Sequence, residues 1–109
     1  MAAPITADMT AKIKLLKTAR GGRESGLPAG EYKGTISTRG QHFSFRCMLP
    51  EVTGLALGAS CTVDIELGFP DLALPIFRAN GEFNLWEGGV IGYGRVLQVR
   101  KPARCSTSI

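Results

Sequence analysis

The chain of 109 residues has little histidine and cysteine, two residue types on which many catalytic and metal sites depend. It has one histidine, His42, and three scattered cysteines, Cys47, Cys61 and Cys105, with no CxxC spacing. A catalytic triad and most zinc sites would have to use His42, and an odd number of cysteines does not indicate a disulfide framework. Residues 1–20 contain no long apolar run. We therefore expect no signal peptide, no membrane span and a cytoplasmic protein with reduced thiols.

Phosphate-binding loops are also missing. The segment "LWEGGVIGYGRVLQV" at residues 85–99 is rich in glycine, but no glycine in the chain precedes Lys and then Ser or Thr, as a Walker loop requires. Gly92-Tyr93-Gly94 lacks the third glycine and the helix of a dinucleotide-binding motif. We interpret Gly88 and Gly89 as a turn, and Gly92 and Gly94 as strand positions that allow close packing or a bend. No cofactor is predicted.

The net charge of +4 comes from two basic clusters, one near each end of the chain. The clusters are Lys12, Lys14, Lys17, Arg20 and Arg23, and Arg95, Arg100, Lys101 and Arg104. Such clusters attract the phosphates of nucleic acids, but on charge alone a solvated protein surface is the favoured interpretation.

Other polar and sulfur-containing residues do not form a recognisable catalytic or metal-binding set. Asp64 and Glu66 share the outer face of a strand, where paired carboxylates are usually solvated. Cys47 falls on the apolar face of its strand and is expected to behave as a small hydrophobic residue. We expect His42 to be solvated. The sequence therefore predicts no catalytic residue and no metal ligand.

Short runs with alternating polarity and no helical periodicity predict an all-β protein, an antiparallel barrel or sandwich. The expected strands are residues 11–17, 31–38 (weakened or bulged at Gly34), 42–49, 61–69, 82–86 and 90–100. We expect no helix, a flexible N-terminus at 1–10, one domain at 11–100 and a tail at 101–109.

The order of these segments resembles the third, C-terminal β-barrel domain of bacterial elongation factor Tu. The similarity is carried by "AKIKLLKT", "GGRESGLPAGEYKG", "GLALGASCTVDIEL" and "LALPIFRANGEFNLWEGGVIGYGRVLQV". It implies a small antiparallel six-stranded barrel that binds partners without catalysing a reaction. In that family the barrel contacts the T-stem of aminoacyl-tRNA and the nucleotide exchange factor.

The resemblance also implies candidate contact residues in two loops. Arg23 matches the family's tRNA-contact arginine, whereas Glu24 and Ser25 replace a histidine and a threonine. Tyr32 matches the tyrosine of the family's Tyr-Arg-Pro segment, and Lys33-Gly34 replace the Arg-Pro of that segment. The family's EGG is retained, but Val90 replaces the arginine that follows it. The candidate contact residues are Arg23, Glu24, Ser25, Tyr32, Lys33, Glu87, Gly88 and Gly89.

Two main hypotheses of function follow. The chain is a binding module for tRNA or another structured RNA, or for a translation factor. Alternatively, it is a protein-interaction or immunity protein that neutralises a toxin and has lost RNA binding. An enzyme has the least support, and the oligomeric state stays open.

Overall fold

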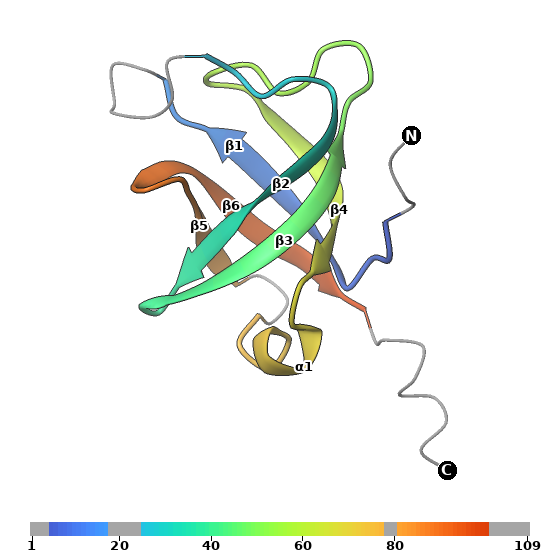
Figure 1. Ribbon diagram of the computed structural model, residues 1–109, viewed down its shortest axis with the longest axis vertical. Helices are drawn as coiled ribbons and strands as arrows, with labels where there is room; N and C mark the ends of the chain where they lie inside the picture. Colours follow the sequence, from blue (N-terminus) through green and yellow to red (C-terminus); the bar gives the residue numbers. More distant parts are fainter. Residues whose placement is uncertain (1–4, 18–24, 78–80, 101–109) are drawn as a thin grey trace.

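Six strands and one helical turn make up the part of the chain that the computed structural model describes, residues 5–17, 25–77 and 81–100 (Figure 1). The elements are β1 (Met9–Leu15), β2 (Gly30–Thr38), β3 (Gln41–Leu49), β4 (Ser60–Leu67), α1 (Pro70–Ala73), β5 (Glu82–Trp86) and β6 (Val90–Val99). β1 begins two residues before the predicted start of the domain. The predicted tail at 101–109 lies outside the described residues.

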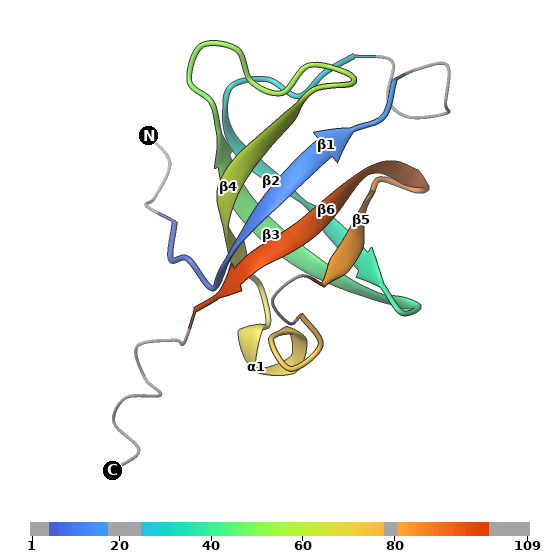
Figure 2. The same ribbon diagram turned by 180° about the vertical axis from the view of Figure 1, so that it is seen from behind.

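The strands close into an antiparallel barrel in the order β1-β4-β3-β2-β5-β6, with β6 paired to β1 (Figures 1 and 2). The predicted all-β, six-stranded antiparallel barrel is therefore confirmed for the described residues. β2 and β3 form a hairpin whose turn residues, Arg39 and Gly40, both have positive φ, of 51° and 77°. Such a turn follows the right-handed twist of the two strands.

The core lies inside the barrel, where alternate residues of each strand meet. In β3, Phe45, Cys47 and Leu49 are buried, as the polarity pattern predicts. Burial also raises the pKa of the Cys47 thiol to about 12. Cys47 is therefore protonated at neutral pH and packs as a small apolar side chain.

Glycines let neighbouring elements approach closely in β6. A side chain at Gly94 would collide with the ring of Phe83, and one at Gly92 with the backbone of Lys14. The predicted packing role of both glycines is therefore confirmed. Gly88 has a φ of 70°, as expected for a turn.

The predicted bulge at Gly34 is wrong. The pairing of β2 with β3 runs without a shift from Gly30 to Thr38, and Gly34 lies opposite Phe45. The ring of Tyr32 covers the space that a side chain at Gly34 would occupy. Gly34 therefore makes room for an aromatic ring and leaves the strand regular.

The prediction that the chain has no helix is also wrong, because α1 follows β4. Proline suits the first turn of a helix, since it lacks only an N–H that would have no partner there. α1 has four residues, too few for helical periodicity to show. It buries Ala73, and Phe77 packs edge-on against Phe43 and Phe83. This segment thus closes one end of the barrel (Figure 1).

Candidate functional site

The first predicted contact loop is described only in part. Arg23 and Glu24 lie outside the described residues. Ser25 is exposed and comes two residues before Leu27, whose backbone exchanges two hydrogen bonds with Leu55, of 2.8 and 2.9 Å. These bonds hold the end of the loop against the segment between β3 and β4.

Two predicted contact residues, one on β2 and one in the β5–β6 turn, meet. The Tyr32 hydroxyl donates a hydrogen bond of 2.6 Å to a carboxylate oxygen of Glu87, although the residues are 55 positions apart. The Tyr32 ring packs edge-on against Phe45, with 5.7 Å between the ring centroids. Gly88 and Gly89 form the turn beside Glu87, whose N–H donates to the Gly89 carbonyl. This contact ties the β5–β6 turn to β2.

Lys33 does not join this pair, because successive residues of a strand point to opposite faces. Its side chain is exposed on the outer face of β2. There it lines a shallow hollow together with Arg46 and Glu66. The predicted contact residues therefore do not gather into one basic surface within the described part of the chain.

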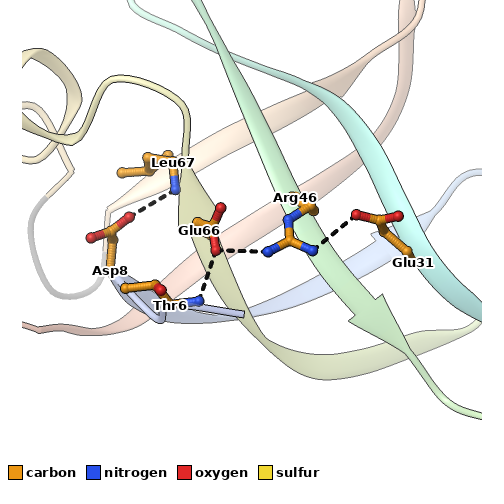
Figure 3. Close-up of polar contacts among 6 residues, drawn as sticks. All are labelled: Thr6, Asp8, Glu31, Arg46, Glu66 and Leu67. Carbon is orange, nitrogen blue, oxygen red and sulfur yellow. Dashed lines mark hydrogen bonds and ion pairs between the residues drawn. The ribbon is translucent and has the colours of Figure 1, made fainter. Parts of the chain in front are cut away.

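The outer face of β2, β3 and β4 carries a chain of ion pairs. The Arg46 guanidinium, in the middle, donates to Glu31 at 2.9 Å and to Glu66 at 3.0 Å (Figure 3). Asp64 accepts a hydrogen bond from Thr10 at 2.8 Å and lies 3.5 Å from Arg100. Asp64 and Glu66 are therefore paired with cations, which the sequence did not predict. Asp64 is also exposed, as the sequence predicted, whereas Glu66 is half-buried. We name the set Glu31, Arg46, Glu66, Asp64, Thr10 and Arg100 the paired face.

Residues just before β1 add to these contacts. The Thr6 N–H donates to Glu66 at 2.8 Å, and this bond together with Arg46 lowers the pKa of the Glu66 carboxyl below its usual value. Asp8 is buried, and its carboxylate accepts a 2.9 Å hydrogen bond from the N–H of Leu67 (Figure 3). Asp8 thus satisfies a backbone donor at the end of β4.

A groove of about 750 Å³ opens on another side of the barrel, over β1, β6 and β5 and beside the β2–β3 turn. These strands lie side by side in Figure 2. Among the described residues that line the groove, four are basic and one is acidic: Lys12, Lys14, Arg39, Arg95 and Glu82. We name this the basic groove.

The strand register orders these side chains in two rows across the basic groove. In one row Tyr93 lies between Lys14 on β1 and Asn84 on β5. In the next, Arg95 lies between Lys12 and Glu82. The Arg95–Glu82 contact is 3.4 Å long, with side chains 60% and 74% exposed, so it is a weak ion pair. Water and ligands can therefore reach these cations.

Sequence reasoning found part of this site. It noted Lys12, Lys14 and Arg95 as members of two separate clusters, and the pairing of β1 with β6 makes them neighbours. It missed Arg39, at a hairpin turn, and Tyr93, which it treated as part of a glycine motif. The alternation in β6 was an available signal for Tyr93, because its neighbours Gly92 and Gly94 are buried.

The residues examined for catalysis lie elsewhere. His42 is exposed and stacks edge-on against Trp86, with 4.9 Å between the ring centroids. Burial raises the pKa of the Cys61 thiol. Within residues 5–17, 25–77 and 81–100, no three His, Cys, Asp or Glu side chains are grouped so that they could hold a metal ion. The same residues include no helix long and apolar enough to cross a membrane.

Comparison with known proteins does not assign the chain to a family. No protein-family model matches it, and no curated protein matches its sequence.

Proposed function

We propose that this protein is a non-catalytic RNA-binding barrel that holds RNA phosphates in the basic groove. The observation that carries the proposal is the convergence of Lys12, Lys14, Arg39 and Arg95 on one open groove with a single carboxylate among its described lining residues. Clustered cations attract the phosphate backbone and release its counterions.

The likeness to the third domain of elongation factor Tu is part of this proposal. Two observations support it: the closed six-stranded barrel, and the contact of Tyr32 on β2 with Glu87 in the β5–β6 turn, two residues that the resemblance had singled out separately. Arg20 and Arg23 follow soon after Lys17 in the chain, so they add basic residues close in sequence to the end of β1. A tRNA or another structured RNA of translation is therefore the proposed partner.

Salt dependence tests the proposal. Binding of the full chain to fluorescein-labelled tRNA, followed by fluorescence anisotropy, is expected to weaken at least tenfold between about 50 and about 200 mM salt. This weakening is expected because each phosphate contact releases counterions. Affinity that does not change with salt, or no binding at the lower salt concentration, would reject the proposal.

A protein-binding role is the second candidate, and one observation favours it. Phe69 and Leu72 are 63% and 67% exposed, three residues apart at α1. Exposed apolar pairs of this kind occur at protein interfaces. Capture of a translation factor or a toxin by the wild-type chain, with loss of capture in Leu72→Ser, would favour this function. Recovery of RNA alone would count against it.

A further inference from the structure

Phosphate binding does not account for Tyr93, whose side chain is one of those that line the basic groove. The residue is 50% exposed, although it belongs to a strand whose alternate residues Gly92, Gly94 and Val96 are buried. An exposed aromatic ring between cations offers a flat apolar surface where phosphate charge is attracted. Aromatic rings in such positions stack on the bases of single-stranded nucleic acids.

The shape of the surface around Tyr93 provides space on two sides. Tyr93 and Lys14 line the basic groove, and they also line a second hollow of about 340 Å³. Lys17 and Gly58 line that second hollow too. Tyr93 therefore stands between two hollows, so a polymer that runs from one to the other passes its ring.

We infer that the basic groove binds an unpaired segment of RNA, with one base stacked on the ring of Tyr93. This inference rests on the proposed function and specifies its ligand. A base in a duplex is stacked on its neighbours, whereas an unpaired base can turn its face to a protein ring. A single protruding ring between two hollows thus suits a single strand better than a duplex.

The cations are placed on both sides of the ring. Lys12, Arg39 and Arg95 line the basic groove on one side, and Lys17 lines the second hollow on the other. The phosphates on either side of the stacked base would each meet a positive charge. This arrangement matches the combination of a basic path and a stacking surface that single strands require.

Uncharged polar residues favour RNA over DNA. Asn84, on β5, lies opposite Tyr93 of β6 and opposite Ser37 of β2. Both Asn84 and Ser37 line the groove. Their amide and hydroxyl groups can donate and accept hydrogen bonds. The 2′-hydroxyl of RNA also does both, so it has partners beside the stacked base.

The test compares ring variants of the full chain by fluorescence anisotropy with labelled oligouridine of about ten nucleotides. Tyr93→Ala is expected to weaken binding by about 5- to 100-fold, because it removes the stacking surface. Tyr93→Phe keeps the ring and should bind within about twofold of the wild type. Leu97→Ala, a change at another exposed position of β6, is the matched control and should leave binding unchanged. Circular dichroism confirms that each variant is folded.

The remaining outcomes separate the inference from the proposed function. A Tyr93→Ala variant that binds oligouridine as well as the wild type overturns base stacking, even if salt-sensitive RNA binding persists. A duplex RNA of equal length that binds as tightly as the single strand also overturns it. Equal affinity for oligothymidine contradicts the choice of RNA over DNA. Absence of binding to every RNA at low salt rejects the proposed function together with the inference.

Discussion

The paired face and the basic groove use charge in opposite ways on one barrel. On the paired face, Arg46 lies between two carboxylates and its side chain is only 15% exposed. In the basic groove, Arg95 has one carboxylate partner, Glu82 at 3.4 Å, and its side chain is 60% exposed. Cations that are already paired bind the strands to one another, whereas cations with few partners are available to a ligand. Net charge alone does not distinguish these two uses.

The largest effect is expected from Asp8, next to the paired face. Asp8→Ala should lower the free energy of unfolding by about 1.5–3 kcal/mol, because the buried N–H of Leu67 loses a charged acceptor. Urea denaturation measures this change. Asp8→Asn, which keeps an acceptor oxygen, should lower the free energy of unfolding by less. Asp64→Ala, which removes a more exposed carboxylate, is the matched control. The RNA affinity of folded Asp8→Ala should equal that of the wild type. A weaker affinity would show that the paired face and the basic groove do not act independently.

A charge reversal in the basic groove is expected to affect binding alone. Lys14→Glu should weaken RNA binding about tenfold at low salt, because one attraction to phosphate becomes a repulsion. Lys33→Glu is the matched control, since Lys33 is also an exposed strand lysine but lies beside Arg46 and Glu66. Anisotropy titrations of both variants provide the comparison. If Lys33→Glu weakens RNA binding as much as Lys14→Glu does, the surface that binds RNA extends beyond the basic groove.

The smallest expected effect is on the stability of the protein at acidic pH, through Glu66. The pKa of Glu66 is lower in the folded protein than its usual value, owing to the Thr6 N–H and Arg46. The carboxyl group of Glu66 therefore binds a proton more readily in the unfolded chain than in the folded protein. Its stabilising effect is complete above the usual pKa and is lost as the pH falls through the lower pKa of the folded protein. Unfolding midpoints measured from about pH 6 to about pH 3 should fall less steeply in Glu66→Gln than in the wild type. Identical slopes would show that the carboxylate of Glu66 does not contribute.

The sequence predicted more of the fold than of the site. Alternation in β3 assigned Cys47 to the core, because a strand with one buried face repeats every two residues. Gly92 and Gly94 were correctly assigned to close packing. The helical turn α1 was missed because four residues carry no helical period. The bulge at Gly34 was wrong because the ring of Tyr32, two positions earlier on the same face of the strand, fills the space beside Gly34, and the strand stays regular.

What the sequence determined by itself was local: which residues alternate, where turns fall and which side chains point inward. Closure of the barrel decided the rest. Lys14 and Tyr93 lie far apart in the chain and become cross-strand neighbours only because β1 pairs with β6. In the same way, Arg46 meets Glu66 only because β3 pairs with β4. A strand's period sets the face on which a charge lies, but pairing between distant strands sets whether that charge meets an opposite charge or an open groove.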